Sequence, residues 1–398
     1  MRIFSKATLN DTFFVLLFLP FWKILTGPRV QPIAVFCVLF LLLKKKTLHH
    51  KPFSIIVILL ISIILSYPID ANYGLRNSIL SVSVIFLPPI IYLGIPYLKG
   101  VYKISIIKIL TLLFTGLALL QSVESLDFLF DPLRVLIPIG PSASISSYRG
   151  VSLLSPEPSN AAFIIATLMW FWHLSNEKIH IIYLLAIAIL IVTNRSGTLV
   201  LLLLPYVLVN ARKYSYFYIS LSPLLILLVT TIEIRVFDVL RNLMNIFQTG
   251  LWRNTEYWYL VSGPRFVEVY IAYTEAFSNI SGLGVGGVES SYTQILQSSG
   301  VSMGKYWNSM VSAGFFENSR PNSYFSYLAM TTGFLPVLCI IFILIRSVRY
   351  APENLKVFGY FSIILLLFRG TITMPYPWIV LGTLLIRNDI YIDKPRSI

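Results

Sequence analysis

The sequence predicts an all-α polytopic membrane protein, and three observations lead to this fold class. Of the 398 residues, 56% are hydrophobic and only 12% are charged, whereas about a quarter of the residues in soluble domains are charged. The apolar residues are gathered in long runs. Short basic segments separate several of these runs. We therefore expect one membrane-embedded domain over residues 1–398, with about twelve transmembrane helices.

The apolar runs place the expected helices in order along the chain. Several runs are shorter than the roughly 20 residues that a straight spanning helix needs, so we expect tilted or broken helices among them. The expected spans are Thr12–Leu25, Gln31–Leu43, Phe53–Tyr67, Ser78–Leu98, Ile104–Gln121, Ser159–His173, Ile179–Val192, Thr198–Val209, Tyr214–Thr231, Tyr324–Ile345, Leu355–Phe368 and Met374–Leu385.

The basic residues predict the orientation of these spans, because loops rich in lysine and arginine stay on the cytoplasmic side. A cytoplasmic N-terminus places the segments 44–51, 99–103, 212–213 and 346–349 inside, and an even number of spans returns the C-terminus to the cytoplasm. The formal net charge of +14 is thus explained by topology. It does not indicate binding to nucleic acid.

Two long segments are expected on the outer side, residues 122–150 and 232–322, and both are expected to contain short helices. In the second, Val236–Gln248 has the pattern of a helix that lies on the membrane surface. A further helix is expected to begin at Pro264, a favoured first helical position, and to end before Gly282. The glycines at 282–287 then predict a turn. They follow a helix, which argues against a dinucleotide fingerprint and its cofactor.

The outer side lacks the residues of a typical metal site. All four histidines map to the cytoplasmic edge, and the outer carboxylates are scattered singly. We therefore expect no bound metal, no Ser/His/Asp triad and no cofactor. Aromatic residues cluster instead, and they suit either stacking against sugar rings or an interfacial aromatic belt. This cluster comprises Trp252, Tyr257, Trp258 and Tyr259.

The most informative string runs from Arg149 to Ala162, with Glu157 between Pro156 and Pro158 where an apolar run begins. Prolines on both sides prevent a continuous helix through the glutamate, so the chain is expected to arrive extended and to become helical near Ser159. Glu157 is then presented at the outer membrane edge, beside the free N–H groups of a helix start. The glutamate has either a catalytic role or a structural one, as a helix cap or a partner of Arg149.

With this string the sequence resembles the Wzy-type O-antigen and capsule polymerases and their relatives, the O-antigen ligases. The resemblance also rests on the Asn194-Arg195-Ser196-Gly197 turn, on the stretch from Pro264-Arg265 to Gly286, and on Arg320-Pro321-Asn322-Ser323-Tyr324. Ligase relatives commonly have a histidine before that asparagine, where this chain has Pro321. The departure argues against a histidine-assisted mechanism.

The resemblance implies a metal-independent glycosyltransferase of the bacterial cytoplasmic membrane. Such an enzyme joins polyprenyl-diphosphate-linked oligosaccharide repeat units on the outer face, into O-antigen, capsule or exopolysaccharide. Its partners are membrane lipids, with flippase and chain-length regulator proteins as further candidates. The alternatives are an O-antigen ligase and a twelve-helix transporter or flippase of lipid-linked glycans. The expected catalytic residues are Glu157, Arg265 and Arg320, and the expected substrate-binding residues are Arg149, Arg195, Tyr257, Trp258 and Asn322.

Overall fold

The computed structural model describes Val15, Phe18, Gln248, Pro321 and the ranges 50–66, 74–95, 104–136, 150–155, 158–175, 179–194, 196–211, 264–298, 323–369 and 375–385. Within these ranges every regular element is a helix, which confirms the all-α class. The helices are α4 (His50–Leu65), α5 (Gly74–Gly94), α6 (Ile104–Gln121), the 3-10 helix η3 (Glu124–Phe130), α7 (Asp131–Leu136), α8 (Pro158–Ser175), α9 (Ile181–Asn194), α10 (Gly197–Ala211), α14 (Pro264–Ser278), α15 (Gly287–Ser298), α17 (Tyr324–Thr332), α18 (Phe334–Arg349), α19 (Glu353–Phe368) and α20 (Tyr376–Leu384).

Most of the expected apolar runs coincide with helices. The run Ile104–Gln121 matches α6 residue for residue, and α4, α5, α8, α9, α10, α19 and α20 lie on the other runs with small shifts at their ends. The expected helix at Pro264 is α14. Three expected spans and the expected surface helix lie outside the described residues, apart from Val15, Phe18 and Gln248. They are Thr12–Leu25, Gln31–Leu43, Tyr214–Thr231 and Val236–Gln248.

One expected helix is wrong as a continuous element. The run Tyr324–Ile345 consists of two helices, α17 and α18, which meet at Gly333 with φ 83° and ψ 175°. Only glycine adopts this backbone conformation readily, because the Cβ atom of any other residue would clash with the backbone. The chain therefore changes direction inside an apolar stretch. In addition, α15 is a short helix that the apolar pattern did not predict.

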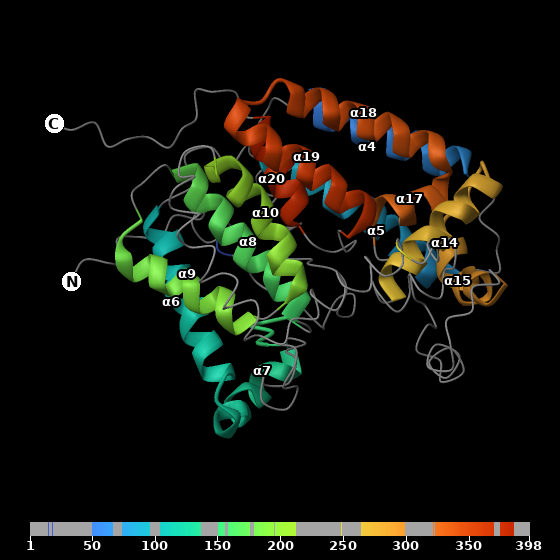
Figure 1. Cartoon of the computed structure of the whole chain (residues 1–398). Coiled ribbons are helices and arrows are strands. Elements are labelled where there is room, and N and C mark those ends of the chain that lie inside the picture. The colour runs from blue at the N-terminus through green and yellow to red at the C-terminus, as the bar shows by residue number, and fades with distance from the viewer. Residues whose placement is uncertain are drawn as a thin grey trace.

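The helices form one packed bundle with a smaller group at one side (Figure 1). Helices α6, α8, α9 and α10 pack together, and α8 and α10 also contact α20 and α19 respectively. At the other side α14, α15 and α17 lie together, while α18 runs beside α4 (Figure 1). The segment 122–150 contributes η3 and α7, so short helices are present in both of the long segments.

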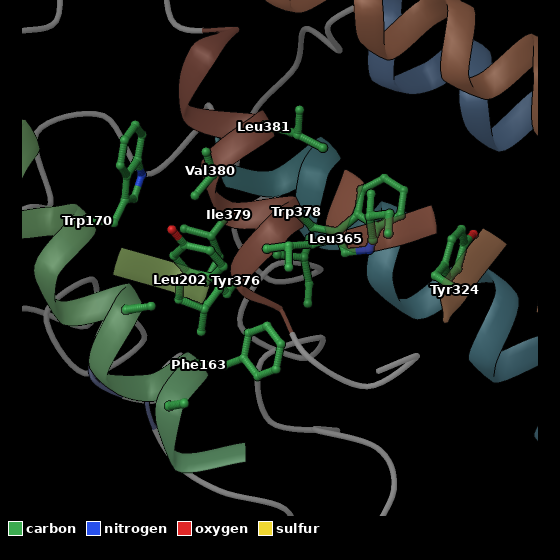
Figure 2. Packing of buried hydrophobic residues seen from close by; sticks show 14 of the residues in the cluster. Phe163, Trp170, Leu202, Tyr324, Leu365, Tyr376, Trp378, Ile379, Val380 and Leu381 are labelled. Atoms are coloured by element: carbon green, nitrogen blue, oxygen red, sulfur yellow. The ribbon is translucent and has the colours of Figure 1, made fainter. Parts of the chain in front are cut away.

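Helix α20 lies at the centre of the bundle, and all nine of its residues are buried. Its aromatic side chains reach three other helices, and Figure 2 shows two of the partners, Phe163 of α8 and Tyr324 of α17. Trp378 packs against Tyr92 of α5 and Tyr324 of α17, with ring centroids 6.1 and 5.1 Å apart, and Tyr376 packs against Phe163 of α8 at 6.2 Å. A helix that is apolar on every side is stable only when it is enclosed by others.

The outer surface of the bundle is apolar as well. Helix α6 exposes Ile109, Leu112 and Leu113, α9 exposes Leu184 and Leu185, and both helices turn their other side to the core. Among the described residues, α6 alone has both the length and the apolar composition of a membrane-crossing helix. The shorter apolar helical stretches are Phe53–Leu65, Ser81–Gly94 and Ile181–Asn194.

Candidate functional site

The candidate residues themselves lie mostly outside the described residues. Arg265 is described in its backbone as the second residue of α14, but its side chain lies outside the described part. Chain neighbours of every quoted motif are described, so the structure shows how the motif segments are held relative to one another. The candidates outside the described residues are Arg149, Glu157, Arg195, Tyr257, Trp258, Arg320 and Asn322.

The first region is the segment Gly150–Ser155, which precedes Glu157 and which we call the clamped segment. It runs beside the end of α9. The backbone N–H of Val151 donates to the carbonyl of Thr193 at 2.9 Å, and the Asn194 amide Nδ2 donates back to the Val151 carbonyl at 3.2 Å. The Arg149–Ala162 string and the Asn194–Gly197 turn are therefore neighbours in space.

Glycine is required at the start of the clamped segment. Gly150 has φ +76°, and a Cβ atom built on it would lie 2.1 Å from the carbonyl oxygen of Asn194. No side chain fits at that distance, so only a glycine lets the segment approach the end of α9 so closely. This steric requirement explains why a glycine follows Arg149 in the sequence.

The clamped segment also contains a strained residue. Leu153 has φ 52°, which is the only positive φ of a non-glycine residue among the described residues. The left-handed conformation costs such a residue about 1–2 kcal/mol. Its carbonyl accepts a hydrogen bond from the Gln121 amide Nε2 at 2.6 Å, and Gln121 is the last residue of α6. The strain is held in place by a side chain from another helix.

Two buried polar atoms at the clamped segment have no hydrogen-bond partner. They are Oε1 of Gln121 and Oγ of Ser152, and both residues are 1% exposed. A buried polar atom without a partner costs about 1–3 kcal/mol. The unpaired oxygens of Gln121 and Ser152 therefore lower the stability of the folded protein.

The start of α8 follows the sequence prediction. Residues 150–155 are not helical, and α8 begins at Pro158. The helix start near Ser159 is confirmed, but the expected extended entry is wrong: Ser152–Ser155 form a turn, in which the backbone N–H of Ser155 donates to the carbonyl of Ser152 at 3.0 Å and Leu153 has φ 52°. Glu157 itself lies outside the described residues. The described residues on either side of it in the sequence are Ser155 and Pro158, the first residue of α8.

The second region joins the glycines after α14 to the end of α17, and we call it the glycine turn, residues 279–286. The backbone N–H groups of Leu283 and Gly284 donate to the carbonyls of Met330 and Thr331, at 2.7 and 3.0 Å. Gly282, Gly284 and Gly286 all have positive φ, as the predicted turn requires. The Pro264–Gly286 stretch is therefore attached to the helix that follows Arg320–Tyr324.

Two glycines make this attachment possible. A Cβ atom on Gly282 would lie 2.5 Å from the carbonyl oxygen of Thr331, and one on Gly333 would lie 2.0 Å from that of Ile280. The close approach also explains why the apolar run breaks at Gly333, since the chain must turn there to receive the glycine turn. At its other end α17 is capped by Ser323, whose Oγ accepts from the backbone N–H of Ser326 at 3.1 Å.

The end of α19 connects the two regions. The Tyr273 hydroxyl of α14 donates to the carbonyl of Leu367 at 3.0 Å. Two residues later, Nη2 of Arg369 donates to Oγ1 of Thr198 at 2.8 Å, and Thr198 directly follows the Asn194–Gly197 turn. The described neighbours of all four motifs are thus linked through hydrogen bonds and helix packing that pass through the end of α19.

Sequence reasoning did not select Arg369. Arg369 directly follows the expected span Leu355–Phe368, on the same predicted side as Arg265. Its place at the end of a span, beside the other candidates, is the sequence signal that could have identified it. Another arginine that the sequence places on the outer side is already paired. Arg134 contacts Asp127 and Asp131 at 2.6 and 2.7 Å, and the hydrogen bond to Asp127 raises the pKa of the guanidinium. Arg134 is therefore bound within segment 122–136 and neutralised there.

A buried carboxylate on α14 was also missed. Glu268 is 5% exposed and lies three residues after Arg265, so the two residues share one side of the helix. Across from α14, the hydroxyl of Tyr292 on α15 is buried without a hydrogen-bond partner. Burial raises the pKa of Tyr292 well above its usual value, and the negative charge of Glu268 raises it further.

No group of three histidine, cysteine, aspartate or glutamate side chains that could hold a metal ion occurs in the described ranges. The two regions instead contain backbone amides, hydroxyls and side-chain amides, and Arg369 lies at the end of α19 between them. No protein-family model, curated protein or solved structure was found to match this chain.

Proposed function

We propose that this protein is a membrane-embedded glycosyltransferase that polymerises polyprenyl-diphosphate-linked oligosaccharide repeat units on the outer face of a bacterial cytoplasmic membrane. One observation carries the proposal. The described neighbours of four separate motifs, at 149–162, 194–197, 264–286 and 320–324, are linked around the end of α19. One site built from all four motifs would require such convergence.

Two features support placement in a membrane. The first is that the core contains a fully buried apolar helix, α20. The second is that the outer sides of α6, α9 and α18 expose large apolar side chains. A surface of this kind is costly in water and favourable in lipid. About twelve spans, with both termini in the cytoplasm, remain our proposal for the whole chain.

The reaction requires a positive environment for its leaving group. In the proposed step the acceptor sugar hydroxyl attacks the anomeric carbon of the donor, and the bond from that carbon to the diphosphate oxygen breaks. The diphosphate leaves with the electron pair, and Glu157 takes the hydroxyl proton. Arg265, in the first turn of α14, stabilises the growing charge, and the helix dipole there also favours an anion. Arg320 and Arg195 assist.

The remaining candidates bind the saccharide and its diphosphate. Tyr257 and Trp258 offer flat faces against which sugar rings stack, and Asn322 offers an amide that can hydrogen bond to hydroxyls. Arg149 can grip phosphate oxygens with its planar guanidinium. The binding is expected to need no cofactor.

The test is an assay of the purified protein in liposomes with a lipid-linked repeat unit. Lengthening of the glycan on the polyprenyl carrier supports the proposal, and Glu157→Gln is expected to abolish most of it while the protein level stays normal. Transfer to a lipid-anchored core sugar alone would identify a ligase instead. Movement of unaltered lipid across the bilayer would identify a flippase and refute the proposed chemistry.

A further inference from the structure

The clamped segment is held by side chains at each of three successive carbonyl groups. Asn194 donates to the carbonyl of Val151, the Ser155 hydroxyl donates to that of Ser152 at 2.5 Å, and Gln121 donates to that of Leu153. Two of these donors come from other elements, the ends of α9 and α6. Ordinary loops turn such groups to water, whereas Val151–Ser155 is buried throughout.

The glutamine uses one half of its amide. The donor Nε2 is bonded, whereas Oε1 is buried without a partner. An apolar side chain of the same length would remove the unpaired oxygen and would leave the buried carbonyl of Leu153 without this donor. The donated bond goes to Leu153, the residue with the strained backbone. The amide is therefore placed where it fixes a conformation that the chain would otherwise leave.

The clamped segment ends directly before Pro156 and Glu157. Leu153 lies two residues before the end of the clamped segment, and α8 begins at Pro158. A change of direction at Leu153 would move Ser155, two residues before Glu157 in the sequence, relative to the end of α9, to which Val151 is bonded. A displacement of about 1 Å in a reacting group can lower a rate a hundredfold.

We propose that Gln121, assisted by Asn194, is a positioning residue that acts through Glu157 by holding the backbone of Gly150–Ser155. This inference rests on the proposed function for its effect on catalysis. It adds a role for two side chains, at the ends of α6 and α9, that contact the backbone of the clamped segment.

The variant Gln121→Met keeps the length and shape of the side chain and removes the donor. The matched control is Thr115→Val on the same helix. Like the Gln121 amide, Oγ1 of Thr115 is buried and reaches a carbonyl outside α6, that of Ala186 in α9 at 3.2 Å, besides the carbonyl of Thr111 in α6 itself at 2.7 Å. We expect Gln121→Met to lower kcat about 10- to 100-fold with KM for the lipid-linked donor changed by less than about twofold. Thr115→Val is expected to keep kcat.

A double-mutant cycle separates positioning from general loosening. If Gln121 acts through Glu157, adding Gln121→Met to Glu157→Gln lowers kcat by less than about twofold further. An equal loss in both backgrounds would refute the inference. So would an unchanged kcat in Gln121→Met, or a rise in KM that accounts for the whole loss.

Hydrogen exchange provides a readout that needs no turnover. In Gln121→Met, peptides covering residues 150–155 are expected to exchange faster, because the amide of Val151 loses its fixed position against Thr193, while Thr115→Val leaves them unchanged. Unchanged exchange in Gln121→Met would refute the clamp. If the wild-type protein lengthens no glycan, the proposed function fails, and this exchange measurement still decides whether the clamp exists.

Discussion

The clamped segment and the glycine turn hold their motifs by different means. In the first, side-chain amides and hydroxyls reach across to backbone carbonyls, and two polar atoms are left without partners. In the second, backbone N–H groups pair directly with backbone carbonyls, and glycines allow the approach. The first region needs Gly150 for its close approach to Asn194 as well, and it depends in addition on side-chain donors from α6 and α9.

This difference predicts different responses to substitution. At the clamped segment a shape-conserving change can leave the fold intact and move Glu157, since the hydrogen-bonding atom is lost and the volume is kept. At the glycine turn any side chain forces two backbones apart, so the fold itself is affected.

The largest effect is expected for Gly333→Ala, which breaks the glycine turn. The new Cβ would lie 2.0 Å from the carbonyl oxygen of Ile280, and φ at this position is +83°. We expect destabilisation of about 3 kcal/mol or more, from the clash and the strained backbone together. Thermal unfolding in detergent, followed by size-exclusion chromatography, measures it.

Gly116→Ala is the control for this substitution. Gly116 lies in α6, and a Cβ atom there meets nothing within 4 Å. The melting temperature is expected to stay equal or to rise slightly, because alanine favours the helix. Equal melting temperatures for Gly333→Ala and the wild type would show that the close approach at Ile280 does not exist.

The next effect concerns Arg265, at the start of the helix that leads into the glycine turn. We expect Arg265→Lys to be nearly as damaging as Arg265→Ala, because an ammonium group keeps the charge but loses the planar fork that grips two phosphate oxygens. Loss of one charge-assisted contact of about 1.5–3 kcal/mol slows the step roughly ten- to a hundredfold. Initial rates of glycan lengthening measure it.

Arg134→Lys is the matched control, since this arginine is already paired with Asp127 and Asp131. Its rate is expected to remain near that of the wild type. Full activity in Arg265→Lys would mean that any positive charge near the start of α14 is sufficient.

A smaller effect is expected for Tyr273→Phe, which weakens the link between the two regions. The substitution removes the hydrogen bond to the carbonyl of Leu367 and leaves the ring in place. We expect a loss of about 1 kcal/mol in the free energy of unfolding and a decrease in rate of a few-fold. Tyr270→Phe, at an exposed position of the same helix, is expected to change neither quantity. Equal stability of the two variants would place the link elsewhere.

The smallest effect is expected from metal removal. The segments expected on the outer side contain no histidine and only scattered carboxylates, so we expect arginines to supply the positive charge. Glycan lengthening should survive EDTA with a rate within about twofold of the untreated protein. Activity lost with EDTA and restored by magnesium would show that a metal carries the diphosphate.

The sequence predicted those elements whose signals are local. The ends of the apolar run Ile104–Gln121 predicted both ends of α6. Pro264 predicted the start of α14, and the glycines at 282–286 predicted the turn after it. These signals depend on one residue type at one position, so they survive without knowledge of the tertiary structure.

The features that were missed depend on distant contacts. Gly333 looks like any small residue in an apolar run, and its positive φ is explained by Ile280, which is 53 residues earlier in the printed sequence. Gln121 marks only the end of a run until Leu153 is placed beside it. Arg369 meets Thr198 across 171 positions of the chain. No periodicity in a single sequence contains such pairings.

The central position of α20 has a consequence for the order in which the protein is made. A ribosome delivers α5, α8 and α17 well before residues 376–384, and these helices supply the partners of Trp378 and Tyr376. Until then Tyr92, Phe163 and Tyr324 have no central helix to pack against, and nascent chains with uncovered apolar surfaces are bound by chaperones or degraded. A ribosome stalled between α19 and α20 would therefore leave a protein with its candidate motifs synthesised and its interior open, and membrane proteases would be expected to remove it.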